Sequence, residues 1–404
     1  MKRDFPLLCT ERDGHRIVYL DSAASAQRPL QVLEAMDDYY STTHANVHRG
    51  VYGIAEEATR RYEAARHHAG AFVGAPNPGR EIVFTKNATE ALNLVASSYG
   101  RRMLAPDRAI VLTEMEHHAN LVPWLMVSAE RGNELRYLPV TEDYRLDLTH
   151  LDELLDGAGI VSVTAMSNVL GTINDLGVIV EAARSHGAIV ICDASQLAPH
   201  RRLDVGALGV DFLAYTGHKM LGPTGIGVLW ARAELLEAMP AFLGGGEMIR
   251  DVRLDGWTPN EIPWKFEAGT PPIAEAIGLD AAMSYLEHVG MQKIADHESA
   301  LTRFAIETLR NDHGDDIRIY GPEADPATRG AVLSIGYRQI HPHDLAQVLD
   351  AEGVCVRAGH HCAKPLMRRL GVAATARASL YLYNDEEDVL ALSAGLEKAR
   401  ALFG

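Results

Sequence analysis

Short apolar segments rich in β-branched residues alternate with amphipathic segments between about residues 80 and 235. The amphipathic segments, such as 88–100 and 175–187, place apolar residues three and four positions apart, which is the period of a helix. Alternating strands and helices are typical of a mostly parallel, doubly wound sheet with helices on both faces. We therefore predict a large α/β domain whose strands lie at 81–84, 109–114, 135–140, 160–167, 188–194, 212–217 and 225–231.

The pattern changes after the last of these strands. Residues 243–272 are rich in Gly and Pro, which predicts irregular loops at an active site or an interface. A long helical run at 274–312 leads to a second set of strands, expected at 317–321, 331–337, 354–359 and 378–383. This set predicts a smaller α+β C-terminal domain. The expected division is an N-terminal segment (1–20) packing on the small domain, a large domain (21–285) and a small domain (286–404).

Composition narrows the class of protein. The chain has 404 residues, 47% of them hydrophobic, and a formal net charge of -16, which argues against a nucleic-acid partner because such surfaces need clustered Lys and Arg. No apolar stretch approaches the roughly 20 residues of a membrane span, and the first residues carry charges where a signal peptide has an apolar core. We therefore expect a cytoplasmic protein with no membrane partner. The four cysteines form no CxxC pair, so no disulfide framework is expected.

Cys362 lies in the run RAGHHCAKPLM, outside any core pattern. Neighbouring cations lower the pKa of a thiol and increase its reactivity. The potential cations in this run are Arg357, His360, His361 and Lys364. This favours a reactive thiol, and a loop cysteine without function is the alternative because neighbours in sequence need not be neighbours in space.

Polar side chains follow three of the predicted strands, at the edge of the sheet where open α/β folds bind ligands. Thr89 comes after the first strand near the start of a helix, which suits a phosphate, although a plain helix cap is the alternative. Asp193 ends one apolar strand, and His218 and Lys219 follow the next. A lone lysine there is more often a surface residue. The combination, however, is what pyridoxal phosphate requires: an amine for its aldehyde, a carboxylate for its ring nitrogen and a helix N-terminus for its phosphate.

The spacing of these residues supports that cofactor. The 26 positions between Asp193 and Lys219 (219 minus 193) leave room for one crossover helix between adjacent parallel strands. The segment 222–227, GPTGIG, does not have the GxGxxG spacing of a dinucleotide loop, and it precedes a strand instead of opening a helix. Glycine there is expected to let the backbone approach a neighbour closely.

From LDSAASAQRP near residue 20 to RASLYLYN near residue 380, the chain resembles the class V aminotransferase family, and specifically the SufS-like (group II) cysteine desulfurases. TGHKMLGPTGIGVLW is similar to the family's Schiff-base segment and EHHANLVPW to its ring-stacking segment. NVLGT and CDASQ resemble its pyridine contacts, and RAGHHCAKPLM its catalytic-cysteine segment. Two departures are KNATE, where many relatives have RGTTE, and DASQ, where DGAQ is commoner. The resemblance implies fold type I of the pyridoxal phosphate enzymes.

The resemblance also implies roles for individual residues. Lys219, Cys362 and His117 would be catalytic, with His117 stacking on the cofactor ring. The other cofactor contacts would be Ala88, Thr89, Asn168, Asp193, Gln196, Thr216, His218 and, from the partner subunit of a homodimer, Thr270. The substrate contacts would be Asn168, Arg357, Arg377, Ala24 and His48.

The implied reaction converts L-cysteine to L-alanine and leaves a persulfide on Cys362, from which a SufU-like or SufE-like acceptor would take sulfur for iron-sulfur cluster assembly. A selenocysteine lyase, another class V transferase and a non-enzymatic sulfur carrier are the alternatives. His341 and His343, in HPHD, resemble a docking feature of relatives that use a zinc-containing scaffold, and an exposed helix N-terminus is the other interpretation. No metal site is expected, because no histidine pair has a third ligand at a recognised spacing.

Overall fold

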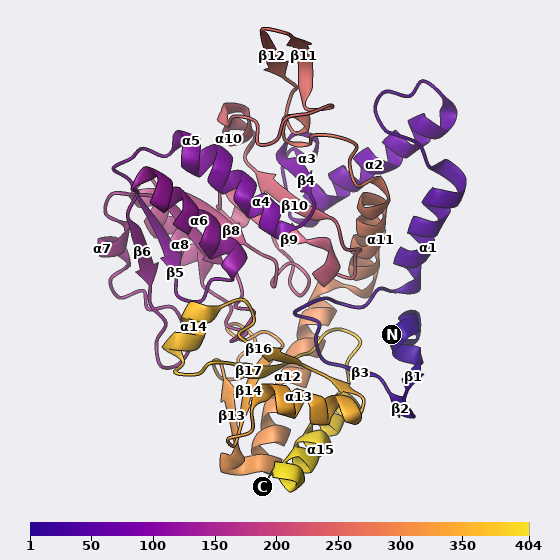
Figure 1. The fold of residues 1–404 in the computed structure, drawn as a ribbon, viewed down its shortest axis with the longest axis vertical. Helices are drawn as coiled ribbons and strands as arrows, with labels where there is room; N and C mark the ends of the chain where they lie inside the picture. Colours follow the sequence, from indigo (N-terminus) through magenta and orange to yellow (C-terminus); the bar gives the residue numbers. More distant parts are fainter. Residues whose placement is uncertain (404) are drawn as a thin grey trace.

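A computed structural model describes residues 1–403 of the chain, and its two largest sheets lie at opposite ends of the molecule (Figure 1). The larger sheet has seven strands in the order β4-β10-β9-β8-β7-β5-β6. Only β10 runs against its neighbours, so the sheet is mostly parallel, as predicted. The strands are β4 (Ile82–Thr85), β5 (Ala109–Thr113), β6 (Leu135–Leu138), β7 (Ala158–Thr164), β8 (Ile189–Asp193), β9 (Phe212–Thr216) and β10 (Gly227–Ala231).

Helices cover both faces of this sheet. Apolar residues of α4 and α6 pack on one face, and those of α2, α8 and α11 pack on the other. The doubly wound prediction is therefore confirmed. The helices of this part are α1 (Leu30–Asp38), α2 (Gly53–Phe72), α3 (Pro78–Glu81), α4 (Ala88–Val95), α5 (Arg101–Met103), α6 (His118–Arg131), α7 (Leu151–Leu155), α8 (Leu176–Ser185), α9 (Val205–Leu208), α10 (Ala233–Ala238) and α11 (Ile273–Val289).

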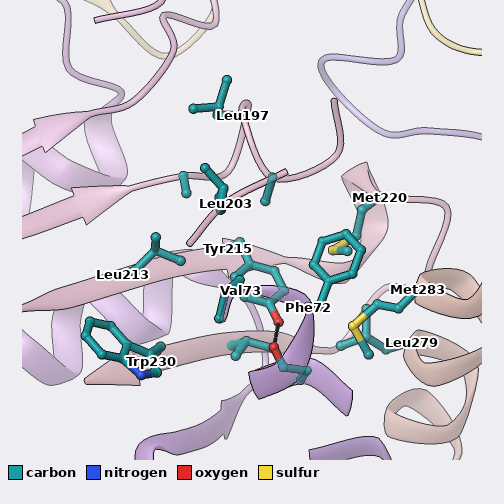
Figure 2. Close-up of a cluster of buried hydrophobic side chains, with 14 of the residues drawn as sticks. Phe72, Val73, Leu197, Leu203, Leu213, Tyr215, Met220, Trp230, Leu279 and Met283 are labelled. Carbon is teal, nitrogen blue, oxygen red and sulfur yellow. Dashed lines mark hydrogen bonds between the residues drawn. The ribbon is translucent and has the colours of Figure 1, made fainter. Parts of the chain in front are cut away.

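A buried apolar cluster packs around the end of β9 (Figure 2). Tyr215 of β9 lies in it, and its hydroxyl donates a 3.1 Å hydrogen bond to the carbonyl of Ala69. Met220 is fully buried in the same cluster. Because Met220 follows Lys219 directly, this packing fixes the segment that carries the lysine.

The small C-terminal sheet is antiparallel, with the order β13-β14-β17-β16. Its strands are β13 (Ile317–Tyr320), β14 (Val332–Tyr337), β16 (Arg357–Gly359) and β17 (Thr375–Ser379). The helices beside it are α12 (Met291–His313), α13 (Pro342–Ala351), α14 (Lys364–Arg369) and α15 (Glu386–Phe403). This arrangement is the predicted α+β domain.

The N-terminal segment contacts the C-terminal part of the chain through β3 (Val18–Tyr19), which forms a separate two-stranded parallel sheet with β15 (Val354–Cys355). Before it lie a two-stranded hairpin of β1 (Glu11–Arg12) and β2 (His15–Arg16). The exact division of the chain at residues 20 and 285 stays a prediction. No helix within residues 1–403 is long and apolar enough to cross a membrane.

Four details of the predicted elements are wrong. The strand expected at 354–359 is two strands in different sheets, since β15 pairs with β3 and β16 pairs with β17. The helical run at 274–312 is two helices, because Gly290 takes a φ of 94° between α11 and α12. The segment 243–272 is not wholly irregular, since it contains a hairpin of β11 (Ile249–Arg253) and β12 (Gly256–Pro259) that projects from the large domain (Figure 1).

The fourth error is the strand expected at 378–383, since β17 begins at Thr375 and ends at Ser379. Asn384 closes a turn instead: its side-chain oxygen accepts a bond from the Tyr381 N–H, and its own N–H donates to the Tyr381 carbonyl. The apolar residues after Ser379 are buried as a loop against the large domain, where the Tyr381 hydroxyl donates to the carbonyl of Pro199.

Candidate active site

A cavity of about 250 Å³ lies at the carboxyl ends of β7, β8 and β9, where the large and small domains meet. It gathers thirteen of the predicted site residues, namely Ala24, Ala88, Thr89, His117, Asn168, Asp193, Gln196, Thr216, His218, Lys219, Arg357, Cys362 and Arg377. A larger open groove of about 960 Å³ lies along α11 and α12, away from these residues. We place the candidate site in the smaller cavity, because the ionisable groups converge there.

One end of the cavity is the N-terminus of α4. Asn87 caps this helix by accepting a 2.9 Å hydrogen bond from the Glu90 N–H, so the interpretation of Thr89 as a plain cap is wrong. Thr89 instead lies in the first turn and lines the cavity. Gly227 of β10 makes this turn possible, because a Cβ there would lie 2.5 Å from the Cα of Asn87. The result is a helix start whose first N–H groups and dipole suit a phosphate.

Lys219 and Asp193 lie at the ends of the neighbouring strands β9 and β8. One short helix, α9, lies in the crossover between them, as the spacing predicts. The side chain of Lys219 opens onto the cavity but is otherwise enclosed, and this burial lowers its pKa to about 8 although Asp193 opposes the shift. Asp193 is 4% exposed and accepts a 3.0 Å bond from the Ser195 N–H.

His117 precedes α6 and is its N-cap. Its Nδ1 accepts a 3.0 Å bond from the Ala119 N–H, so the neutral ring carries its proton on Nε2. Burial, reinforced by the charge of Lys219, lowers the pKa of His117 to about 4. Burial likewise lowers the pKa of His218 to about 4. Both imidazoles are therefore neutral at physiological pH.

Cys362 is exposed on a short loop between β16 and α14. The loop is held on both sides of the thiol: the His118 N–H donates a 2.7 Å bond to the carbonyl of Cys362, and the Asn168 side chain donates a 2.7 Å bond to the carbonyl of His361. His361 and Cys362 have φ values of 50° and 55°, in the left-handed region that costs a non-glycine residue roughly 1–3 kcal/mol. The loop therefore holds the thiol in a fixed, strained backbone conformation that faces both the cavity and solvent.

The two predicted substrate arginines lie together. Arg377 is 2% exposed and donates a 3.0 Å bond from Nη1 to the carbonyl of Asn168. Arg357 is more exposed and lies on β16, next to the cysteine loop. Both guanidinium groups also bind Asp21, at 3.1 Å from Arg377 Nη2 and 3.0 Å from Arg357 Nη2.

Two acidic residues of this region were not among the predicted site residues. Asp21 was missed because its contacts are more than 300 positions away in the sequence. Glu116 was missed because the sequence gives no signal for it other than its position directly before His117. It accepts hydrogen bonds from Thr113, Asn120 and the Thr164 N–H, and burial raises its pKa to about 8. Glu116 thereby joins the ends of β5 and β7 to the start of α6.

His48 and Thr270 do not line the cavity within one chain. His48 lies beside Tyr62, with ring centroids 5.8 Å apart, and its Nε2 is 2.8 Å from a carboxylate oxygen of Glu63. Thr270 and Tyr62 both line a separate pocket of about 310 Å³. His48 and Thr270 therefore both lie near Tyr62, on a part of the surface separate from the cavity. Within one chain, neither residue makes the contact predicted for it.

Buried polar atoms in the cavity fit pyridoxal phosphate. Among residues 1–403, Gln196 Oε1 and Thr216 Oγ1 are buried without a hydrogen-bond partner, and both residues line the cavity. An amide oxygen can accept from the hydroxyl of the cofactor ring, and a threonine hydroxyl can donate to its phosphate. With Lys219, Asp193 and the start of α4, the donor set matches each functional group of this cofactor.

The comparisons with known proteins agree with this geometry. The model of the aminotransferase class V family matches residues 18–392. The chain belongs to the class V aminotransferase family. This family depends on pyridoxal phosphate, so the predicted cofactor is confirmed.

Individual relatives narrow the enzyme class. The chain is 51% identical to a probable cysteine desulfurase of Streptomyces coelicolor, over 100% of this chain and 97% of the relative. It resembles the apo structure of a cysteine desulfurase from Thermococcus onnurineus with a TM-score of 0.93 and 39% identity, covering 98% and 96% of the two chains. The cysteine desulfurase CsdA of Escherichia coli matches with a TM-score of 0.90 and 38% identity, covering 99% and 98%. The predicted enzyme class, cysteine desulfurase, is confirmed.

Proposed function

We propose that this enzyme is a group II cysteine desulfurase that takes sulfur from L-cysteine, releases L-alanine and holds the sulfur as a persulfide on Cys362. The observation that carries the proposal is the placement of the exposed Cys362 loop at the mouth of the cavity that holds Lys219. Lys219 is suited to activate the substrate, and Cys362 is suited to accept its sulfur.

Lys219 would carry the cofactor and remove the proton from the α-carbon of the substrate. Its pKa of about 8 gives the amine a substantial neutral fraction near physiological pH, as a base requires. When bound, pyridoxal phosphate withdraws electrons from the α-carbon and weakens the bond between the β-carbon and sulfur. Asp193 would keep the ring nitrogen protonated, and Gln196 would accept from the ring hydroxyl.

The substrate carboxylate would bind Arg377, whose guanidinium is oriented by the Asn168 carbonyl and suits a bidentate contact. Asn168, Ala24 and Arg357 would line the rest of the substrate path. His117 would stack on the cofactor ring, with its Nε2 proton available as a donor because Nδ1 is occupied. Thr89, Ala88, Thr216 and His218 would surround the phosphate.

Cys362 would attack the substrate sulfur as a thiolate. A sulfur–sulfur bond forms, the carbon–sulfur bond breaks, and its electron pair stays on the β-carbon, which is protonated to the methyl group of alanine. The step needs no external oxidant, since the sulfur is oxidised as the carbon is reduced. The solvent-exposed side of Cys362 would present the persulfide to a SufU-like or SufE-like acceptor that serves iron-sulfur cluster assembly.

We further propose that the enzyme works as a homodimer in which His48 and Thr270 reach the cavity of the partner subunit. Their shared location outside the cavity of their own chain supports this proposal. Docking of the acceptor at His341 and His343 stays a prediction. Both side chains are exposed at the start of α13, where His341 Nδ1 accepts a 3.3 Å bond from the His343 N–H.

The test is an assay of the purified enzyme loaded with pyridoxal phosphate. We expect a visible absorption band that borohydride removes, and alanine formed from L-cysteine with sulfur on the protein. Cys362→Ala should keep the band and lose alanine formation from L-cysteine. Cys9→Ala is the matched control, because Cys9 is also exposed but lies in the N-terminal segment. A Cys362→Ala enzyme that keeps most of its activity, with selenocysteine as the preferred substrate, would instead establish the selenocysteine lyase.

A further inference from the structure

His118 contacts the backbone of the Cys362 loop at two points. Its own backbone N–H donates a 2.7 Å bond to the carbonyl of Cys362, and its ring Nε2 accepts a 3.1 Å bond from the Lys364 N–H. His118 is the first residue of α6, whereas Lys364 is the first residue of α14. One residue beside the large sheet therefore spans the segment 362–364, and one of its two contacts depends on the side chain.

The side-chain contact requires a neutral ring. A ring nitrogen accepts a hydrogen bond only when it carries no proton, so the proton of the neutral His118 ring lies on Nδ1. Burial lowers the pKa of His118, and the charges of His360 and Lys364 lower it further. Among residues 1–403, the ring makes no hydrogen bond to a carboxylate that would favour its charged form. His118 is therefore neutral at physiological pH and able to accept.

The ionisable groups that face His118 oppose its protonation. The centroid of its ring lies 5.7 Å from that of His360 and 6.4 Å from that of His117. Lys364 adds the positive charge of its side chain. His360 also contacts the loop backbone, since its Nδ1 accepts a 3.1 Å bond from the Cys362 N–H. A proton on His118 would thus remove the bond to Lys364 and place a positive charge beside these groups.

The backbone of the loop needs such contacts to keep its conformation. His361 and Cys362 have φ values of 50° and 55°, and a left-handed conformation at such residues persists only where the surroundings fix it. Asn168 fixes the carbonyl of His361 on one side. His118 fixes the Cys362 carbonyl and the Lys364 N–H on the other. Loss of the ring acceptor would therefore let the segment after Cys362 relax and shift the thiol.

We propose that the neutral imidazole of His118 is a positioning group that fixes the Cys362 thiol for sulfur transfer, and that protonation of this ring loosens the loop. The inference rests on the proposed transfer of the substrate sulfur to Cys362. His118 does not line the cavity, so it acts on the thiol only through the backbone of the loop.

The experiment measures the single-turnover rate of persulfide formation on Cys362 in the loaded enzyme at saturating L-cysteine. His118→Ala should slow this step about fivefold or more, as expected for one lost hydrogen bond, without weakening the binding of L-cysteine. His118→Gln should restore the rate to within about twofold, because its side-chain oxygen can accept from the Lys364 N–H. His150→Ala is the control: His150 is exposed before α7 and does not line the cavity.

The pH dependence separates this role from a general loss of stability. The bond from Lys364 is present when the ring is neutral and is lost as the pH falls through the pKa of His118. The other groups titrate alike in the wild type and in His118→Gln, so the ratio of the two rates isolates this one ring. The ratio of the wild-type rate to the His118→Gln rate should fall as the pH decreases from about 7.5 to about 5. A constant ratio, a wild-type rate in His118→Ala or no recovery in His118→Gln overturns the proposal.

Hydrogen exchange of the unloaded enzyme gives a readout that needs no sulfur chemistry. After correction for intrinsic rates, residues 360–369 should exchange about fivefold faster in His118→Ala than in the wild type. In the wild type, protection of this segment should decrease as the pH falls, which keeps the proposal testable if His118→Ala does not fold. Constant protection overturns the proposal. Failure of the proposed function is distinct, since wild-type Cys362 would then gain no sulfur while the exchange results still hold.

Discussion

The backbone N–H of His118 donates a 2.7 Å hydrogen bond to the carbonyl of Cys362. His118 is the first residue of α6 in the large domain, and Cys362 belongs to the small domain. The bond therefore ties the thiol to the helix start that His117 caps. The proposed sulfur transfer depends on this fixed placement, because the thiolate must meet the substrate sulfur at bonding distance.

Asn168 should be important for sulfur transfer because its side chain forms one of the hydrogen bonds that hold the Cys362 loop in place. Asn168→Ala removes the 2.7 Å bond to the His361 carbonyl and should slow persulfide formation roughly tenfold, as expected for one buried hydrogen bond. Rapid-quench measurement of the persulfide checks this. Asn133→Ala is the control: it also removes buried bonds to backbone carbonyls, but far from the cavity, and should lower stability without slowing transfer. Equal slowing in both variants would contradict a role for the hydrogen bond between Asn168 and His361 in sulfur transfer.

Loading of the apoprotein with pyridoxal phosphate should depend on pH through Lys219. Burial lowers the pKa of this amine to about 8, and only the neutral amine attacks the aldehyde. The loading rate should thus rise as pH increases to about 8 and level off above it. Asp193 favours the charged amine, so Asp193→Asn should move the midpoint to lower pH. Stopped-flow absorbance between pH 6 and 10 gives the profile, and a rate that climbs steadily to pH 10 would contradict the assignment.

Gly227 should be required for cofactor affinity. In Gly227→Ala, the added Cβ would lie 2.3 Å from the carbonyl carbon of Asn87 and push the start of α4 away from the cavity. An overpacked contact costs roughly 1–3 kcal/mol, so pyridoxal phosphate should bind about tenfold or more weakly. Equilibrium titration of the apoprotein measures this. Gly53→Ala has open space around the new Cβ and should bind the cofactor normally.

The large domain should depend on a buried ion pair between Arg66 and Glu267. The guanidinium of Arg66 is fully buried and contacts both carboxylate oxygens of Glu267, at 2.6 and 2.9 Å. Removing one partner leaves an uncompensated buried charge, so Arg66→Ala should lower the free energy of unfolding by about 3–5 kcal/mol.

Urea denaturation measures this loss, and the exposed pair of Arg60 and Glu57 provides the control, since Arg60→Ala should change stability very little. In a double-mutant cycle, Arg66→Ala with Glu267→Ala should cost less than the two single changes added together. Strict additivity would show that the two side chains do not act as a pair.

The ionisable residues Asp193 and Lys219 could be predicted from the sequence because they lie at the ends of strands, and the apolar pattern of a strand shows where it ends. Asp193 and Lys219 each follow an apolar strand, and the spacing between them predicts their adjacency. Asp21 could not be found in this way, because β3 and β17 bring it to the arginines through contacts distant in sequence.

The errors in secondary structure have local causes. The hairpin of β11 and β12 had a signal, Asp255-Gly256, that favours a tight turn. Gly290 had the signal of a helix end, and its left-handed φ breaks the run that periodicity joined. The run after Ser379 is apolar because it is buried against the large domain, and its apolar pattern alone does not distinguish a buried loop from a strand.

The persulfide on Cys362 is tested most sharply by mass spectrometry of the peptide that contains this residue, after the loaded enzyme has been incubated with L-cysteine alone. This peptide should gain the mass of one sulfur atom, in proportion to the alanine formed, and Lys219→Ala should abolish both. A peptide of unchanged mass while alanine accumulates, or added sulfur on Cys9 or Cys355 instead, would contradict the transfer of sulfur to Cys362.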